Sequence, residues 1–146
     1  MVDDVIKSYK LGEMAEKCDS IKAEATVADF IRTAREKNTE ILPVLDDDNK
    51  VVGIVSEKDL IKLIKVEGVA SNYPIIENRL PKGMLSEPIT SIMTAEPVTL
   101  KETDSLESVI NLILNHDFRR VIIVDAEKKL VGKIRIADMI YKLSRL

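Results

Sequence analysis

Apolar residues recur at helical spacing in two parts of the chain, at positions i, i+3, i+4 and i+7. The first set is Val27, Phe30, Ile31 and Ala34, and the second is Leu106, Val109, Ile110 and Ile113. This spacing places each set on one face of a helix. A short extended segment precedes each predicted helix, at residues 20–21 and 98–100.

Each predicted helix is followed by two apolar runs that flank a turn-rich stretch, the pattern of a β-hairpin. The runs are residues 41–45 and 51–55 in the first case and residues 121–124 and 130–134 in the second. Apolar residues at helical spacing return afterwards, at 60–64 and 139–143. Pro43 cannot donate a ladder hydrogen bond, so we expect it at a sheet edge or a gap.

These two β-α-β-β-α units form an internal repeat with a constant offset of 79 residues. The offset matches Gly53 with Gly132 and Asp59 with Asp138. A unit of about 50 residues cannot bury its own sheet, so we expect the two to pack together about a pseudo-two-fold axis. The predicted fold class is therefore α+β, with two βαββα repeats.

The repeat divides the chain into four parts. These are an N-terminal extension at 1–12, a first repeat at 13–65, a connecting segment at 66–90 and a second repeat at 91–146. The extension predicts a short helix that begins near Asp3 and Asp4, with Val5, Ile6 and Tyr9 on one face.

The connecting segment holds three prolines and two glycines, which is typical of an irregular connection. Its length is unusual for a loop in a compact domain. We expect Ile75, Ile76 and Leu80 to pin part of it to the surface.

Composition narrows the class of function. A net charge of −3 gives no global attraction for nucleic acid or an anionic membrane. No run approaches the roughly 20 apolar residues of a membrane span. Cys18 is the only cysteine and His116 the only histidine, which excludes an intrachain disulfide and a Cys/His zinc site. The acidic N-terminus is unlike a signal peptide, so we expect a cytoplasmic protein.

Catalytic and metal-binding patterns are weak. No Gly-rich phosphate loop is present, and His116 follows a predicted helix on the expected surface. The stretch Asp46-Asp47-Asp48-Asn49 lacks the Gly and Glu of an EF-hand loop. We expect it to form the turn of a hairpin, which needs no metal. We therefore expect a protein that is not an enzyme and requires no cofactor.

Several segments resemble a CBS domain. In the second repeat these are 91–100, 119–125 and 132–138, and in the first they are 42–46 and 53–59 with a weaker opening at 12–16. Two copies in this order resemble a tandem CBS pair, or Bateman module. The resemblance implies a regulatory sensor that binds an adenosyl ligand between the copies, forms a homodimer and acts on a separate enzyme or transporter.

The resemblance also implies roles for individual residues. In the family, a Gly-x-x-Ser/Thr-x-x-Asp stretch contacts the nucleoside, so Asp59 and Asp138 would accept hydrogen bonds from ribose hydroxyls. Ser56 would contact a phosphate or ribose oxygen. An alternative for Ser56 and Asp59 is a capping box at a helix start. The equivalent of Ser56 in the second repeat is Arg135, which would either hold a phosphate or fill the pocket and block it.

Basic residues predict one functional nucleotide site, not two, with Arg119 and Arg120 on its phosphate side. Arg119 and Arg120 begin the first hairpin strand of the second repeat, where the family often contacts phosphates, whereas the first repeat has Glu40 and Ile41. The alternative for the arginines is a surface salt bridge with Asp117 or Glu40.

The predicted apolar walls for adenine are Ile41, Val98, Thr99 and Ile122. We expect AMP, ADP or ATP as the ligand rather than S-adenosylmethionine or NAD. The arginines favour a phosphorylated ligand over S-adenosylmethionine, whose sulfonium is positive. A scaffold, dimerisation or adaptor module with a vestigial pocket is the alternative function.

Overall fold

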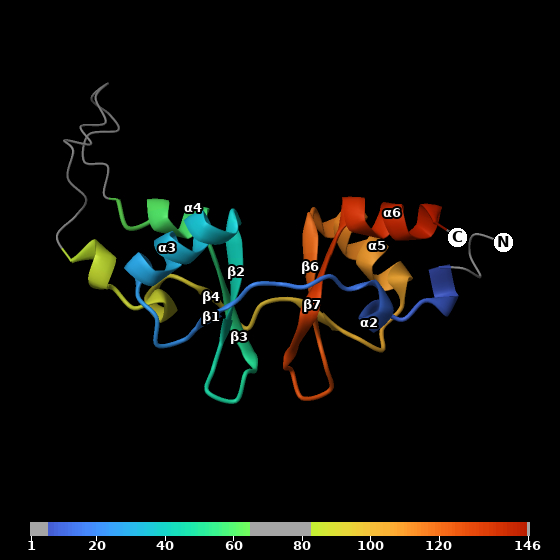
Figure 1. The fold of residues 1–146 in the computed structure, drawn as a ribbon, viewed down its shortest axis with the longest axis horizontal. Helices are drawn as coiled ribbons and strands as arrows, with labels where there is room; N and C mark the ends of the chain where they lie inside the picture. Colours follow the sequence, from blue (N-terminus) through green and yellow to red (C-terminus); the bar gives the residue numbers. More distant parts are fainter. Residues whose placement is uncertain (1–5, 65–82, 146) are drawn as a thin grey trace, which may run out of the picture.

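The computed structural model describes residues 6–64 and 83–145, which form two similar halves side by side (Figure 1). The first half contains β1 (Ile21–Lys22), α3 (Val27–Lys37), β2 (Ile41–Leu45), β3 (Val51–Ser56) and α4 (Glu57–Ile61). The second contains β5 (Thr99–Lys101), α5 (Leu106–His116), β6 (Arg120–Val124), β7 (Leu130–Arg135) and α6 (Ile136–Ser144). The predicted βαββα order is confirmed in both repeats.

Short elements precede each repeat. They are α2 (Leu11–Met14) before the first, and two 3-10 helices, η1 (Met84–Ser86) and η2 (Ile89–Ser91), with β4 (Thr94–Ala95) before the second. The strands form one sheet in the order β1-β2-β3-β4 and another in the order β5-β6-β7. Within the described residues, no helix is long and apolar enough to cross a lipid bilayer.

The hairpin turns are built by the same side chain in both repeats. Oδ1 of Asp46 accepts hydrogen bonds from the backbone N–H groups of Asp48 and Lys50, at 2.8 and 2.9 Å. Asp125 makes the equivalent pair of bonds, also at 2.8 and 2.9 Å. An aspartate that bonds its own backbone two residues on is a standard way to stabilise a turn. The repeated aspartates are therefore explained by turn geometry.

Pro43 lies in β2, which is an interior strand of its sheet. The neighbouring strand β1 pairs only with Val44 and Leu45, so β2 has no partner on that side at Pro43. Pro43 thus occupies a gap in the ladder, which is one of the two environments that the sequence predicts. The missing N–H of a proline costs no hydrogen bond where no neighbouring strand offers an acceptor.

The two repeats exchange their leading segments, which we define as residues 11–16 and 89–95. Leu11 and Met14 are buried in the core of the second repeat, whereas Ile89 and Ile92 are buried in the core of the first. Figure 1 shows α2 among the elements of the second half. Each repeat therefore completes its core with residues that precede the other repeat in sequence.

Backbone pairing follows the same exchange. The second leading segment supplies β4, which pairs antiparallel with β3. The first leading segment pairs with β7, where Glu16 and Lys133 exchange N–H···O bonds of 2.8 and 2.9 Å. A Cβ on Gly132 would lie 2.4 Å from the Glu16 carbonyl oxygen, and one on Gly53 would lie 2.4 Å from the Met93 sulfur. The matched glycines thus permit the close approach of the exchanged segments.

The parts of the chain outside the repeats agree with expectation near the N-terminus and differ from it before the second repeat. Residues 6–8 are helical, and Ile6 and Tyr9 pack against the second core, whereas Asp3, Asp4 and Val5 lie outside the described residues. Sequence analysis placed residues 83–90 in an irregular connection. Instead Met84 and Ile89 are buried in the first core, because the exchange makes this stretch part of a repeat. Ile75, Ile76 and Leu80 lie outside the described residues.

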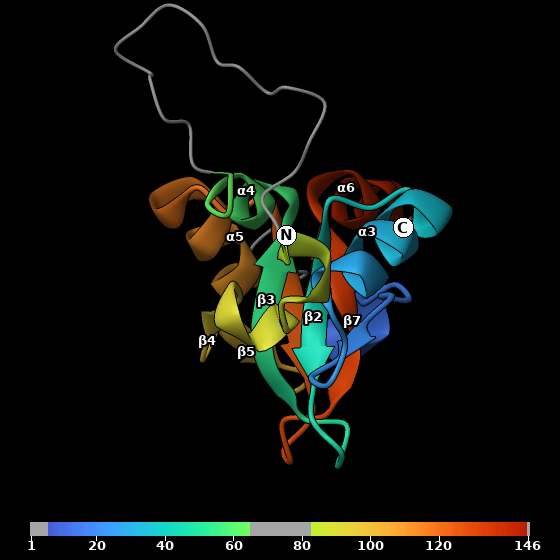
Figure 2. The same cartoon turned by 90° about the vertical axis from the view of Figure 1, so that its left-hand side faces the viewer.

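A third apolar cluster joins the two halves. Leu45 and Val51 from the first sheet pack with Ile122 and Val124 from the second. The hairpins also touch at their tips, where the Val51 N–H donates to the Lys128 carbonyl at 2.9 Å. In Figure 2 these tips lie at one end of the molecule, and helices α4 and α6 lie at the other. The clefts described next lie between halves that are packed on each other.

Candidate functional site

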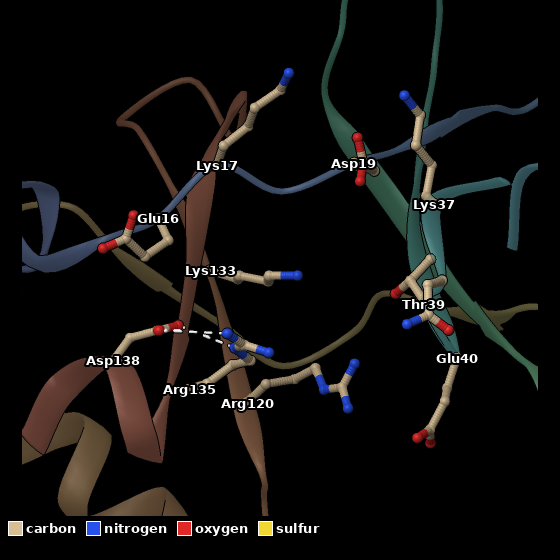
Figure 3. A pocket seen from close by; sticks show the side chains of 11 residues that line it. Glu16, Lys17, Asp19, Lys37, Thr39, Glu40, Arg120, Lys133, Arg135 and Asp138 are labelled. Atoms are coloured by element: carbon tan, nitrogen blue, oxygen red, sulfur yellow. Dashed lines mark hydrogen bonds and ion pairs between the residues drawn. The ribbon is translucent and has the colours of Figure 1, made fainter. Parts of the chain in front are cut away.

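A cleft of about 450 Å³ lies between the two halves, and we call it the Asp138 cleft. Its lining comes from the second repeat (Arg120, Lys133, Arg135, Asp138), the first leading segment and its continuation (Glu16, Lys17, Asp19), and the end of α3 with the residues that follow (Lys37, Asn38, Thr39, Glu40). Figure 3 shows these side chains on both sides of the gap between the repeats, with Arg120 and Lys133 extending toward the opposite half. The volume falls within the range of small-molecule sites, roughly 300–1,000 Å³.

Arg135 and Asp138 form a two-point ion pair in this cleft. Arg135 Nε donates to Asp138 Oδ2 at 3.0 Å, and a terminal guanidinium nitrogen donates to Oδ1 at 3.3 Å (Figure 3). The hydrogen bond from Arg135 lowers the pKa of Asp138 below its ordinary value, and the same contact raises the pKa of Arg135. Asp138 is therefore an ionised acceptor at neutral pH, and Arg135 occupies both of its oxygens.

Two further cations in this cleft have no carboxylate partner. Arg120 and Lys133 take part in none of the ion pairs between described residues. Arg120 lies directly opposite Arg135 in the β6–β7 ladder, so two guanidinium groups share one face of the sheet. Like charges in this arrangement repel each other unless an anion is nearby. The predicted salt bridge from Arg120 to Asp117 or Glu40 is absent from the described residues.

A second cleft, of about 510 Å³, carries Ser56, and we call it the Ser56 cleft. The first repeat contributes Glu40, Ile41, Ser56, Glu57 and Lys58, and the second contributes Asp117, Phe118, Arg119 and Arg120. Asp117 and Phe118 are the repeat equivalents of Asn38 and Thr39, which line the Asp138 cleft. The two clefts are thus related by the same pseudo-symmetry as the repeats.

Asp59 forms the helix cap that the sequence offered as an alternative to ligand binding. The Ser56 N–H and Oγ both donate to Asp59 Oδ2, at 2.8 and 3.2 Å. Asp59 Oδ1 pairs with Lys62 Nζ at 2.8 Å. The Asp59 side chain is buried, so these bonds satisfy a carboxylate that water scarcely reaches. A ribose contact for Asp59 stays a prediction, and it would have to displace part of this cap.

The four predicted adenine walls do not form one surface. Ile41 lines the Ser56 cleft. Val98 is half exposed, and Ile122 is buried between the two sheets. Thr99 lines a different cavity of about 860 Å³ near the hairpin tips. Ile41 is thus the one of the four that lines a cleft between the repeats together with Ser56 and the arginines.

Sequence analysis missed one wall of each cleft, which comes from the end of the first long helix of the opposite repeat. Asn38 ends α3 in the left-handed conformation, with φ of 50°, and Asp117 ends α5 likewise, with φ of 57°. This conformation turns the chain sharply after each helix and brings Thr39 and Phe118 to the clefts. The signal in the sequence was the matched position of an Asn and an Asp, the residues that tolerate this conformation.

Cys18 lies beside the inter-repeat cluster on the chain between Lys17 and Asp19 of the Asp138 cleft. Burial raises the pKa of its thiol to about 11, although the nearby Lys133 charge acts in the opposite direction. The side chain is therefore a neutral thiol at physiological pH and behaves as a small apolar residue.

Comparison with known families gives a consistent result. A family model described as CBS domain matches residues 3–66 and 89–145. The chain is 30% identical over 125 residues to the chloroplastic CBS domain-containing protein CBSX2 of Arabidopsis thaliana, which covers 77% of this chain and 52% of that protein. It is 29% identical over 148 residues to CBSX1 of the same plant, covering 90% and 63%. The chain thus spans about half to two thirds of the length of these relatives.

Solved structures share the fold. The crystal structure of CBSX2 in complex with AMP is 27% identical, has a TM-score of 0.74, and is matched over 95% of this chain and 99% of that one. MJ1225 from Methanocaldococcus jannaschii is 25% identical with a TM-score of 0.76, over 92% of this chain and 49% of that one. These likenesses cover both repeats, so they confirm the predicted resemblance and the α+β fold class.

Proposed function

The chain belongs to the CBS domain family as a tandem pair, and from this premise we propose that it is a non-catalytic regulatory module that binds AMP, ADP or ATP in the Asp138 cleft. The observation that carries the proposal is the pairing of an ionised carboxylate with unpartnered cations in one cleft. Asp138 is an acceptor suited to ribose hydroxyls, and Arg120 and Lys133 are donors suited to phosphate.

The Arg135–Asp138 pair defines what binding requires. The guanidinium uses both carboxylate oxygens that a ribose diol would use. A nucleotide would replace Arg135 at Asp138, and the released guanidinium would then be free to bond a phosphate. The exchange preserves the number of charge-assisted hydrogen bonds, so its cost is small compared with that of uncovering a buried charge.

The charge of the cleft supports a phosphorylated ligand. Its lining carries five cationic side chains against four carboxylates, which are Glu16, Asp19, Glu40 and Asp138. Arg120, Arg135 and Lys133 gather on the wall that carries Asp138, where they would repel the sulfonium of S-adenosylmethionine and attract phosphates. The relative CBSX2, which has been solved with AMP, provides the precedent for an adenine nucleotide in this fold.

We expect saturable binding when nucleotide-free protein is titrated with AMP in an isothermal calorimeter. Asp138→Ala and Arg120→Ala should each weaken the affinity about tenfold or more, because each removes a charge-assisted contact. Asp47→Ala is the matched control, since Asp47 is an exposed hairpin-tip carboxylate and its loss should leave the affinity unchanged. Absence of heat with AMP, ADP and ATP in a folded chain would refute the proposal.

A scaffold or adaptor module is the second candidate, and one observation favours it. Both ribose-type carboxylates are already occupied, Asp138 by Arg135 and Asp59 by the helix cap. Such a module would act on a separate enzyme or transporter through its surface. In this reading the clefts are vestigial, and the module functions by association.

Association would use apolar side chains on α4 and α6. Ile61, Ile136, Ile140 and Tyr141 are 43–62% exposed, and both helices lie at the end of the molecule away from the hairpin tips (Figure 2). We expect a homodimer at micromolar concentration in sedimentation velocity, and a monomer for Ile140→Asp. Leu114→Asp, on α5, is the control that should remain dimeric. A wild-type chain that sediments only as a monomer would contradict this expectation.

A further inference from the structure

Arg120 is the cationic side chain that the two clefts share. It lines the Asp138 cleft and the Ser56 cleft. Figure 3 shows it extending from β6 across the space between the halves, toward the wall that carries Thr39 and Glu40. Each of the other cations that line these clefts lines only one of the two. The Asp138 cleft has Lys17, Lys37, Lys133 and Arg135, and the Ser56 cleft has Arg119 and Lys58.

The repeat explains why there is only one such arginine. The position equivalent to Arg120 in the first repeat is Ile41, at the same offset of 79 residues as the matched glycines. Ile41 also lines the Ser56 cleft but offers no charge. The pseudo-two-fold axis therefore relates two clefts of similar size, but it does not relate Arg120 to a second cation.

Arg120 is available to an anion in either cleft. It is half-buried and lacks an ion-pair partner among the described residues, although Arg135 faces it across the ladder. Its planar guanidinium can present a two-pronged hydrogen bond to one phosphate at a time. A phosphate bound in one cleft would therefore take the donor that a phosphate in the other cleft needs.

A second contribution acts in the same direction. Two phosphates that both approach Arg120 lie near each other, and like charges repel most strongly where water is partly excluded. Glu40 also lines both clefts and adds negative charge at the same place. Once Arg120 is neutralised by one phosphate, the next phosphate has only the other cations of its own cleft to offset this repulsion.

We infer that Arg120 couples the two clefts negatively, so that a phosphorylated adenosine ligand in the Asp138 cleft weakens phosphate binding in the Ser56 cleft, and the reverse. The inference rests on the proposed function and adds regulation to it. By linkage, the coupling has the same size in both directions. The module then responds to rising nucleotide over a wider concentration range than two independent sites would.

The test uses single tryptophans, because the chain contains none. Thr39→Trp places a fluorescent reporter in the Asp138 cleft, and Phe118→Trp places one at the equivalent position of the Ser56 cleft. AMP is titrated against each reporter chain, and calorimetry of the same chains counts the AMP bound. Asp138→Ala, with Lys133→Glu as a second variant, then disables the Asp138 cleft, which the reporter at position 39 verifies.

We expect disabling the Asp138 cleft to lower the AMP midpoint at position 118 about fivefold or more. In an Arg120→Ala background the same change should leave that midpoint within about twofold, because the shared donor is gone. Arg119→Ala is the matched control, because Arg119 lines the Ser56 cleft and not the Asp138 cleft. It should raise the AMP midpoint at position 118, and disabling the Asp138 cleft should still lower that midpoint about fivefold.

The outcomes separate this inference from the proposed function. If the AMP midpoint at position 118 does not change when the Asp138 cleft is disabled and Arg120 is present, the coupling is overturned, whereas the proposed nucleotide binding is not. A Ser56 cleft that stays empty after the Asp138 cleft is disabled also overturns it. No saturable response at either reporter, with no heat in the wild-type chain, overturns the proposed function and the coupling with it.

Discussion

Gly132→Ala should lower the free energy of unfolding by about 3 kcal/mol, a large fraction of the stability of a domain of this size. A Cβ at this position would lie 2.4 Å from the Glu16 carbonyl oxygen and 3.1 Å from the Ala15 Cβ. The obstacle is backbone that is itself hydrogen-bonded to Lys133 in both directions, so it cannot move without breaking the pairing. Equilibrium urea unfolding, monitored by circular dichroism, measures the loss.

Gly53→Ala is the matched control, because it is the repeat equivalent of Gly132 and also faces an exchanged segment. There the nearest atom is the Met93 sulfur, at 2.4 Å, and Met93 is a flexible side chain that can move aside. We expect a loss of about half that of Gly132→Ala. Equal losses, or a larger loss for Gly53→Ala, would contradict the assignment of strain to the backbone of the first leading segment.

The elements of the fold could be predicted because they depend on local spacing. The helix stripe from Val27 to Ala34 and the apolar runs on either side of Asp46 are visible within a few residues, and they appear as α3 and the β2–β3 hairpin. The offset of 79 residues then transfers the same elements to the second repeat. Periodicity of this kind needs no knowledge of what a segment packs against.

The exchange of leading segments could not be predicted in this way. Leu11 and Met14 are apolar residues that would suit either core equally well. The sequence contains no signal for which repeat they pack against, and the structure places them in the second. Gly53 and Gly132 were recognised only as matched positions of the repeat, and the close approach that they permit appears only in the structure. The buried state of Met84 was missed for the same reason, since most of its core, from Ile21 to Val55, lies far away in sequence.

The candidate site shows a similar division. The acidic and basic residues were found from the family pattern, and Arg120, Arg135 and Asp138 do meet in one cleft. The sequence left two roles open for Arg135, and its pairing with both oxygens of Asp138 appears only in three dimensions. Thr99 was named as a wall for adenine, whereas in three dimensions it lines another cavity, near the hairpin tips.

Leu11→Ala should cost about 3 kcal/mol and should destabilise the second repeat first, although Leu11 precedes the first repeat in sequence. Its side chain is fully buried in the cluster with Leu106, Val109 and Ile134. Removing three carbons from a packed core loses their transfer free energy and leaves a cavity. Urea unfolding gives the total loss, and native-state hydrogen exchange shows where protection falls.

Leu114→Ala is the control for the chemistry of the substitution, because Leu114 is 76% exposed on α5 and its truncation should change stability by less than about 0.5 kcal/mol. In Leu11→Ala, the amides of β6 and β7 should exchange faster before those of β2 and β3 do. Loss of protection confined to β2 and β3 would mean that Leu11 supports its own repeat. The expected pattern would instead establish that the second repeat depends on the leading segment of the first. Loss of that segment would then loosen the half that carries Arg120, Arg135 and Asp138, and with it one wall of the Asp138 cleft.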